Sequence, residues 1–402
     1  MTEGEVIAFD TPALDAEYVM QTYARLPVTF VRGEGTRLFG DNGSEYLDFV
    51  GGLAVVSLGH AHPAVADALA DQARTLLHVS NLYYNELQPR LAARLDSLIG
   101  GGGRVFFANS GAEANECAIK LARRHGQLHG GPARTDIVTL LGSFHGRTLA
   151  TLAATGQPKK HDAFQPLPEG FRHVVPGNLE DLAVALDERV CAVMVEPLQA
   201  EGGVLPLPPG YLEGVRTLCD EQEALLVVDE VQTGLGRTGK WFGFQHTSVS
   251  PDLVTVAKAL GNGVPIGACW ARADVAGAFR VGDHASTFGG QPLAVRAALS
   301  VLDVMEAEDV PTRAMAAGER LRGALAKITG VESVRGAGLL LAAELAAPLD
   351  AREVAVEALE VGLVVNAVTP RAVRFAPPLL VTDNEIDDAV ARFAAAVARS
   401  AT

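Results

Sequence analysis

Short apolar runs recur through the middle of the chain, and amphipathic stretches lie between several of them. The runs have the length of buried strands, and the stretches between them repeat apolar residues at helical spacing. Strands separated by helices favour a mostly parallel sheet that is covered on both faces. The expected strands are residues 105–108, 137–141, 190–195, 225–228 and 253–256, and the expected helices are residues 114–125, 179–186 and 211–222.

The two ends of the chain have a different pattern. Near the start, the apolar segments 36–39 and 45–49 flank Asp-Asn-Gly, which is a strong hairpin signal. Helices are expected at 63–77 and 87–98, then at 293–308 and 312–328, followed by strands at 331–334 and 339–344 and a closing helix. We therefore predict an α/β protein in three parts: an N-terminal segment (1–60) that packs with the small domain, a large α/β domain (61–300) and a small C-terminal α+β domain (301–402).

Composition and charge narrow the range of partners. The 402 residues contain 48 Asp and Glu against 33 Lys and Arg, a net charge of −15, and this argues against a nucleic-acid partner. The four cysteines are scattered singly, without the spacing of a zinc or redox motif, and no metal-ligand spacing links the histidines. No uncharged apolar run reaches the roughly 18 residues of a membrane span. The N-terminus lacks a basic region followed by an apolar one, so we expect a cytoplasmic protein without a signal peptide.

Two glycine-containing segments are candidates for binding phosphate. The first, Gly-Leu-Gly-Arg-Thr-Gly-Lys at 234–240, resembles a nucleotide-binding loop. However, Trp241 stands where a P-loop needs Ser or Thr. Five residues separate the preceding strand from these glycines, and no periodic helix follows, which disfavours dinucleotide binding. A nucleotide-binding module remains as an alternative, and ATP or NAD binding by a colourless protein would support it.

The second segment is Asn109 to Glu113, between an expected strand and an expected helix. A helix N-terminus presents unpaired amide groups and a positive dipole end, so it can hold a phosphate. Ser110 adds a hydroxyl group, and Gly111 permits close approach. Ordinary helix capping by Asn109 or Ser110 explains the same residues, so this segment alone decides nothing.

Asp229 and Lys258 give a more specific signal. Asp229 ends a strongly apolar run, which places it at the carboxyl end of a buried strand, where α/β sheets bind ligands. Lys258 lies within another apolar stretch, and desolvation there should lower its pKa and leave a nucleophilic amine. An ordinary lysine would instead extend its charge to the surface. A phosphate loop, a strand-end aspartate and a buried lysine together are what pyridoxal 5'-phosphate requires, with Lys258 bound to its aldehyde and Asp229 paired with its ring nitrogen.

Several further motifs occur in order along the chain. With them, the sequence resembles the class III aminotransferases of pyridoxal-phosphate fold type I, and within that class the acetylornithine aminotransferases. The resemblance implies a large domain with a mostly parallel seven-stranded sheet and a smaller C-terminal domain. The motifs are YVMQTYARLPV (18–28), SGAEANE (110–116), FHGRT (144–148), EPLQAEGGV (196–204), DEVQTGLGRTG (229–239), KALGNGVPIG (258–267), STFGG (286–290) and RFAPPL (374–379).

The same resemblance implies the contacts of the cofactor. The phosphate would be held by Ser110, Gly111 and Ala112, and the two faces of the ring would be covered by Phe144 and Val231. Gln232 would reach the phenolic oxygen, Asp229 would pair with the ring nitrogen and Lys258 would bind the cofactor covalently. Thr287 would contact the phosphate of the neighbouring subunit's cofactor. The resemblance therefore implies a homodimer with shared active sites.

Four residues are implied in substrate binding. Arg147 would bind the α-carboxylate of acetylornithine, with Ser286 beside it. Arg374 would bind the α-carboxylate of glutamate, and Glu201 would pair with Arg374 when the other substrate is present. The implied reaction moves the δ-amino group of N-acetylornithine to 2-oxoglutarate, a step of arginine biosynthesis. Alternatives are another ω-amino donor (ornithine, succinyl-diaminopimelate, succinylornithine or 4-aminobutyrate) and an isomerase that uses the same cofactor residues.

Overall fold

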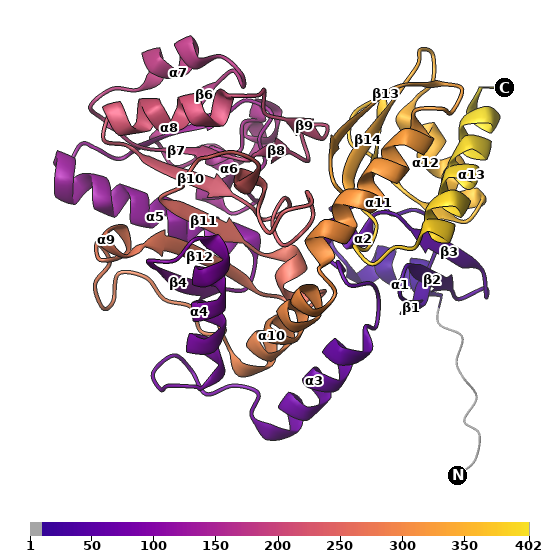
Figure 1. Ribbon diagram of the computed structural model, residues 1–402, viewed down its shortest axis with the longest axis horizontal. Coiled ribbons are helices and arrows are strands. Elements are labelled where there is room, and N and C mark those ends of the chain that lie inside the picture. Colours follow the sequence, from indigo (N-terminus) through magenta and orange to yellow (C-terminus); the bar gives the residue numbers. More distant parts are fainter. Residues whose placement is uncertain (1–9, 402) are drawn as a thin grey trace.

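The computed structural model describes residues 10–401, which form two lobes (Figure 1). The larger lobe contains most of the chain up to α10 (Pro292–Ala307), and the smaller one contains the C-terminal helices together with the N-terminal strands. The first nine residues, on which the expectation of no signal peptide depends, lie outside the described part. None of the helices within residues 10–401 is both long and apolar enough to cross a membrane.

A seven-stranded sheet forms the centre of the large lobe. Its order is β4 (Gly103–Ala108), β12 (Gly267–Arg272), β11 (Leu253–Val256), β10 (Leu225–Asp229), β7 (Val190–Val195), β5 (Asp136–Leu140) and β6 (Phe171–Val174). The five strands from β11 to β6 pair in parallel, whereas β12 runs antiparallel to both of its neighbours. The expected mostly parallel sheet is confirmed, and β6 and β12 are strands that the sequence pattern did not reveal.

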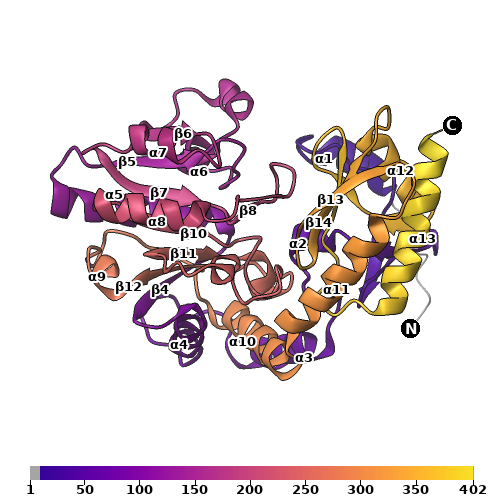
Figure 2. The same cartoon turned by 45° about the horizontal axis from the view of Figure 1, so that its top comes forward.

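Helices cover both faces of this sheet (Figure 2). Successive side chains of a strand point to opposite faces. Accordingly, Leu226 and Val228 pack into one buried cluster, and Leu225 and Val227 into another. The helices of the lobe are α3 (Pro63–Thr75), α4 (Leu87–Ile99), α5 (Gly111–Gly130), α6 (Leu149–Ala154), α7 (Leu179–Ala185), α8 (Tyr211–Glu221), α9 (Ala273–Ala276) and α10. The strands are buried on both sides for this reason, which explains their nearly continuous apolar sequence.

The small lobe combines residues from both ends of the chain. One four-stranded sheet has the order β13 (Val331–Ala337), β14 (Leu340–Leu345), β17 (Ala372–Phe375), β16 (Asn366–Ala367), and the other has the order β1 (Phe30–Glu34), β2 (Arg37–Gly40), β3 (Glu45–Asp48), β15 (Leu363–Val364). The expected hairpin is β2–β3, and β3 also pairs in parallel with β15. The domain boundaries near residues 60 and 300 stay a prediction.

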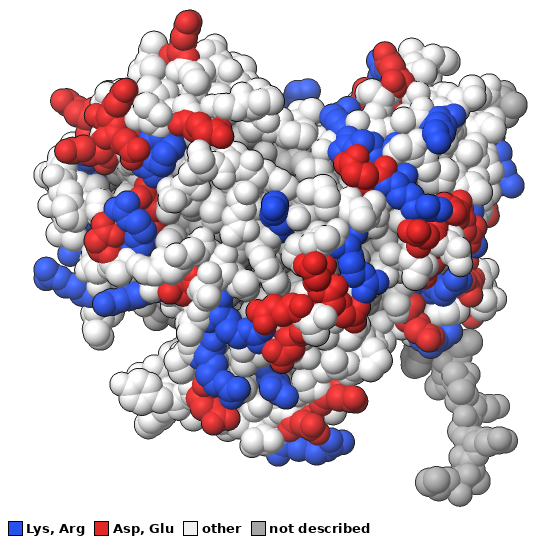
Figure 3. Space-filling model, in the orientation of Figure 1, with Lys and Arg blue, Asp and Glu red and all other residues white. Residues whose placement is uncertain are grey.

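The remaining helices belong mainly to the small lobe, and the remaining strands are short. The helices are α1 (Thr11–Tyr18), α2 (Gly51–Ala54), α11 (Val310–Leu325), α12 (Ala351–Glu360) and α13 (Asp383–Ser400), the strands are β8 (Leu198–Gln199) and β9 (Leu205–Pro206), and the 3-10 helices are Pro158–Lys160, Asp162–Phe164, Gly243–His246 and Lys258–Gly261. Acidic and basic side chains lie interspersed over both lobes on the face shown in Figure 3.

Candidate active site

A cavity of about 380 Å³ lies at the carboxyl ends of β10 and β11. Asp229 is the last residue of β10, and Lys258 begins the 3-10 helix just after β11, its parallel neighbour. The cavity brings together nine of the residues singled out from the sequence: Ser110, Gly111, Ala112, Phe144, Arg147, Asp229, Val231, Gln232 and Lys258.

Asp229 is buried and held by three donors. Its Oδ2 atom accepts a hydrogen bond from Asn115 Nδ2 at 2.8 Å and lies 2.7 Å from His145 Nδ1, and its Oδ1 accepts from the Val231 N–H at 3.0 Å. Burial lowers the pKa of His145, but the hydrogen bond and charge of Asp229 outweigh it and leave the pKa raised. The carboxylate is thus fixed in position at the cavity wall, where it can hold a proton on a ring nitrogen.

Lys258 has the properties of a nucleophilic amine. Loss of water around the amine lowers its pKa to about 8, and the negative charge of Glu201 is the largest opposing influence. Its φ of +42° lies in the left-handed region, an uncommon backbone conformation for a residue with a side chain. Such strain is often found where a side chain must point at a ligand.

The N-terminus of α5 forms another wall of the cavity. Ser110 caps this helix, since its Oγ accepts a hydrogen bond from the Glu113 N–H at 3.2 Å. The backbone packs tightly here: a Cβ atom on Gly111 would lie 2.7 Å from Val231 Cγ1, and one on Gly267 would lie 2.3 Å from the Ser110 carbonyl oxygen. Capping and phosphate binding are compatible, because further amide groups of the first helical turn have no intrahelical partner.

These residues fit pyridoxal 5'-phosphate. The helix end suits the phosphate, the fixed carboxylate suits a protonated ring nitrogen, and the amine of low pKa suits the aldehyde. In addition, two buried polar atoms beside Asp229, namely Asn115 Oδ1 and His145 Nε2, have no hydrogen-bond partner within residues 10–401. Both residues line the cavity, so a polar ligand bound there can supply the missing partners.

An arginine from the small lobe reaches the same region. Arg374 on β17 is fully buried, and its Nη1 atom donates to Glu201 Oε1 at 2.5 Å and to Gln232 Oε1 at 3.0 Å. Burial raises the pKa of Glu201, but the charge and hydrogen bond of Arg374 outweigh it and lower the pKa. The Nη2 atom of Arg374 is buried without a partner in the described chain. Arg374 and Glu201 are therefore paired in this structure, and the Arg374 guanidinium has a further donor available.

Arg147 and Phe144 lie at another side of the cavity. The Arg147 guanidinium is 5.5 Å from the centroid of the Phe144 ring, and Arg147 itself is exposed. The Phe144 N–H donates to Glu196 Oε1 at 2.9 Å, and burial raises the pKa of Glu196 to about 8. Sequence reasoning missed Asn115 and Glu196 as supports of the site, although both lie within motifs that it had quoted.

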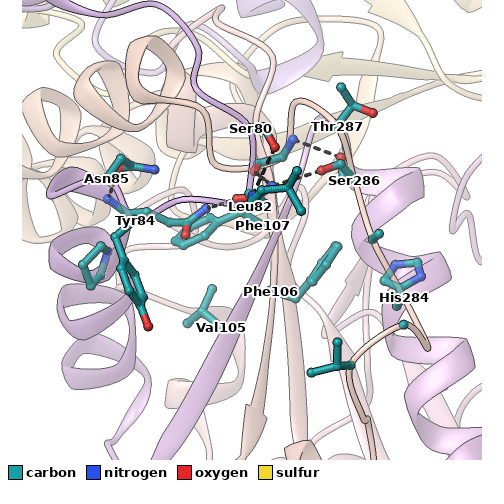
Figure 4. Close-up of a pocket in the computed structure, with 18 of the residues that line it drawn as sticks. Ser80, Leu82, Tyr84, Asn85, Val105, Phe106, Phe107, His284, Ser286 and Thr287 are labelled. Carbon is teal, nitrogen blue, oxygen red and sulfur yellow. Dashed lines mark hydrogen bonds between the residues drawn. The ribbon is translucent and has the colours of Figure 1, made fainter.

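The residues Ser286 and Thr287 lie apart from the others. Both line a second, wider cavity of about 780 Å³, shown in Figure 4. Ser286 is linked to the first cavity by one hydrogen bond, which its Oγ accepts from Asn109 Nδ2 at 3.2 Å. Within a single chain, therefore, Thr287 does not join the other predicted cofactor residues.

The glycine-rich segment 234–240 has a structural role in this fold. It forms turns, and a 3-10 helix (Gly243–His246) follows it instead of an α-helix, so no helix N-terminus faces these glycines. Arg237 within it is fully buried and donates to the carbonyl oxygens of Leu339 and Pro377. The segment thus ties the two lobes together.

The chain resembles known proteins over nearly its whole length. Residues 18–397 match the family described as aminotransferase class-III. An acetylornithine aminotransferase of Caldanaerobacter subterraneus is 50% identical over 380 residues, which is 94% of this chain and 96% of that protein. A succinylornithine transaminase/acetylornithine aminotransferase of Pseudomonas aeruginosa is 46% identical, over 95% of each chain.

A solved structure gives the same result. The ornithine aminotransferase of Toxoplasma gondii superposes with a TM-score of 0.92 and 36% identity, covering 96% of this chain and 94% of that one. The family match, the sequence identities and the agreement of the folds all cover the cavity that Asp229 and Lys258 line. The chain belongs to the class-III aminotransferases, enzymes that depend on pyridoxal 5'-phosphate.

Proposed function

We propose that this enzyme transfers the δ-amino group of N2-acetyl-L-ornithine to 2-oxoglutarate. The products are N-acetylglutamate 5-semialdehyde and glutamate, and the reaction is a step of arginine biosynthesis. The observation that carries the proposal is the buried Arg374 covered by Glu201, because a donor without a carboxylate next to its reacting amine needs that arginine covered. The name of the Caldanaerobacter relative supports the same donor.

The two substrates make opposite demands on one site. Glutamate carries a carboxylate on the carbon that reacts, whereas acetylornithine reacts at a terminal carbon that carries none. Once Glu201 moves away, Arg374 can bind the glutamate α-carboxylate. While Arg374 is paired with Glu201, as in this structure, it tolerates the uncharged chain of acetylornithine. An arginine–carboxylate bond contributes about 1.5–3 kcal/mol, so covering or exposing Arg374 changes substrate preference by roughly one to two orders of magnitude.

Arg147 serves both substrates at their other end. It lies exposed at the cavity and forms no ion pair with another described residue, so its guanidinium is available. In our proposal it binds the α-carboxylate of acetylornithine, with Ser286 beside it. The amino acid end of the donor is then held away from the reacting carbon, and the δ-amine is directed toward Lys258.

The chemical step is assigned to Lys258 and Asp229. When bound, pyridoxal phosphate supplies an electron-withdrawing ring that stabilises the negative charge left on the substrate carbon. Lys258 would hold the cofactor and, once displaced from it, its free amine would take the proton from the substrate carbon and later give it up again. Asp229 keeps the ring nitrogen protonated: a charge pair at 4 Å contributes roughly 4 kcal/mol at an effective dielectric of 20, or about three pKa units.

The remaining cofactor contacts are proposed from their positions in the cavity. Ser110, Gly111 and Ala112 would bind the phosphate at the N-terminus of α5. Phe144 and Val231 would cover the ring faces, and the Gln232 amide would reach the phenolic oxygen. The cofactor would then be fixed by groups of the large lobe, while Arg374 comes from the small one.

We further propose that the enzyme is a cytoplasmic homodimer with shared active sites. Thr287 lies away from the first cavity, as it should if it contacts the cofactor of a second copy. The wider cavity is bordered by the exposed apolar side chains Leu82, Tyr84 and Val281, which a second copy would cover. Light scattering of Tyr84→Arg should show a shift toward monomer, and a wild-type enzyme that is monomeric yet active would contradict the proposal.

A panel of amino donors tests the substrate assignment. With 2-oxoglutarate as acceptor, we expect the highest kcat/KM for N-acetylornithine among acetylornithine, succinylornithine, succinyl-diaminopimelate, ornithine and 4-aminobutyrate. Succinylornithine is the second candidate, because the Pseudomonas relative is named for both activities. Arg147→Ala should lower kcat/KM for acetylornithine, and unchanged turnover would refute the carboxylate assignment.

A further inference from the structure

The Glu201 carboxylate needs a second position in the site, because a substrate carboxylate takes its place on Arg374. In the proposed function, on which this inference rests, the glutamate α-carboxylate displaces Glu201 from Arg374. Glu201 is about a quarter exposed, so its displaced charge stays partly desolvated. Leaving a desolvated charge without a partner costs free energy, and a second cation within reach would reduce that cost.

Lys160 is a cation at this place that the proposed mechanism does not use. It ends the 3-10 helix Pro158–Lys160 and is half-buried. Its Nζ atom lies 5.4 Å from the centroid of the Phe144 ring, the same ring that the Arg147 guanidinium approaches to 5.5 Å. Lys160 is therefore positioned beside two residues of the predicted site.

Its partners in the present arrangement are neutral. Nζ donates a hydrogen bond to the side-chain oxygen of Gln157. No carboxylate within residues 10–401 lies within the 4.0 Å of an ion pair. An ammonium group that is half-buried against an aromatic ring and lacks a counter-ion has the capacity to accept one.

Lys160 has one charged neighbour of each sign, Arg147 and Glu201. Burial lowers the pKa of Lys160, the positive charge of Arg147 lowers it further, and the negative charge of Glu201 opposes both. The fold also places Glu201 close to Lys160. The Gln157 side chain that accepts from Lys160 donates to the Gly142 carbonyl oxygen at 3.4 Å, and a Cβ atom on Gly202, next to Glu201, would lie 2.7 Å from that same oxygen. A move of Glu201 toward Lys160 would relieve the repulsion between the two cations.

We propose that Lys160 is a positioning residue that receives the Glu201 carboxylate when a substrate carboxylate occupies Arg374. Glu201 then has two ion-pair partners, Arg374 for the acetylated donor and Lys160 for glutamate or 2-oxoglutarate. Two other cations near Glu201 are not available in the proposed function: Lys258 is engaged with the cofactor, and Arg147 binds the carboxylate at the far end of the substrate. Lys160 acts through Glu201 and does not touch the reacting atoms.

The test separates the two half-reactions of the holoenzyme. In Lys160→Met, single-turnover spectroscopy should show that the second-order rate constant for glutamate falls roughly tenfold, which corresponds to about 1.4 kcal/mol. The rate constant for the acetylornithine half-reaction should change less than about twofold. The dissociation constant of glutarate, an unreactive dicarboxylate, measured by calorimetry, should rise by about the same factor. Lys159→Met is the matched control, because it removes an exposed charge one position away.

A double-mutant cycle decides whether Lys160 acts through Glu201. In the Glu201→Gln background, Lys160→Met should have no further effect on glutamate or glutarate. In the enzyme that keeps Glu201, Lys160→Arg should behave like the wild type, because the positive charge is retained. Equal loss in both half-reactions, or an undiminished loss in the Glu201→Gln background, would overturn the proposal. The experiments with glutamate and glutarate use no acylated donor. Their outcome can therefore be interpreted even if acetylornithine is not the donor.

Discussion

Two carboxylates of the active site are held in different ways. Asp229 is almost fully buried, and its three donors all belong to the large lobe. Glu201 is about a quarter exposed, and its main partner Arg374 comes from the small lobe. The first arrangement fixes a charge that the cofactor needs throughout the reaction. The second can be exchanged, which suits a site that accepts two unlike substrates in turn.

We call Asp229 and Lys258 the fixed end of the site, and Glu201 and Arg374 the exchangeable end. The largest predicted effect falls on the fixed end. Lys258→Ala should lower kcat by at least about 10⁴-fold, because a positioned proton-transfer group contributes roughly 10²–10⁴-fold and the covalent anchor of the cofactor is lost as well. Turnover with acetylornithine and 2-oxoglutarate measures the loss, and borohydride treatment of the protein with cofactor should no longer trap an adduct. Lys240→Ala is the control, since this exposed lysine belongs to the glycine-rich segment. Comparable loss in Lys240→Ala would favour that segment as the functional one.

Asp229→Asn tests whether the fixed charge, as opposed to the shape of the group, is what matters. The amide has the size of the carboxylate but no charge, so the ring nitrogen loses about three pKa units of stabilisation and kcat should fall about 10³-fold. Steady-state kinetics with both substrates should show similar losses, because Asp229 serves both half-reactions. A loss confined to one substrate would contradict the view that this carboxylate is a constant part of the site.

The exchangeable end should respond unequally to the two substrates. Glu201→Gln removes the negative charge that covers Arg374, so kcat/KM for acetylornithine should fall about tenfold or more while glutamate is affected little. Arg374→Gln should do the reverse. Single-turnover rates with each substrate measure the difference. If both variants lowered both rates equally, Arg374 and Glu201 would be a structural pair and the contrast with Asp229 would disappear.

The two ends also differ in how far the sequence predicts them. Asp229 and Lys258 could be found because each follows an apolar run, and the end of a buried strand fixes where such a residue lies. The strands β5, β7, β10 and β11 carry that signal for the same reason. The strand β12 was missed because its sequence, Gly-Ala-Cys-Trp-Ala-Arg, has neither an alternating nor a strongly β-branched pattern.

Residues that act through tertiary contacts could not be found without a structure. Asn115 lies in the second turn of α5, where its sequence neighbours predict only a helix, yet its amide donates to Asp229 from a distant segment. Arg237 is an ordinary turn residue in sequence but is fully buried between the lobes. Lys160 is one of two adjacent lysines in the sequence, and the structure alone shows that it is half-buried near the Phe144 ring whereas Lys159 is exposed.

The smallest predicted effect concerns pH and the fixed end of the site. Since desolvation lowers the pKa of Lys258 to about 8, about a tenth of the amine is neutral at pH 7 and most of it at pH 9. Only the neutral amine attacks an aldehyde, so the rate at which the cofactor-free protein takes up pyridoxal phosphate should rise about tenfold over this range and then level off. Stopped-flow absorbance measures that rate. A lysine with its ordinary pKa near 10.4 would instead give a rise of roughly a hundredfold over the same range, with no plateau below pH 10.

Glu201→Gln should move the plateau to lower pH, because the charge of Glu201 is the largest influence that opposes the lowering of the Lys258 pKa. An unmoved plateau would mean that the two ends of the site are electrostatically independent.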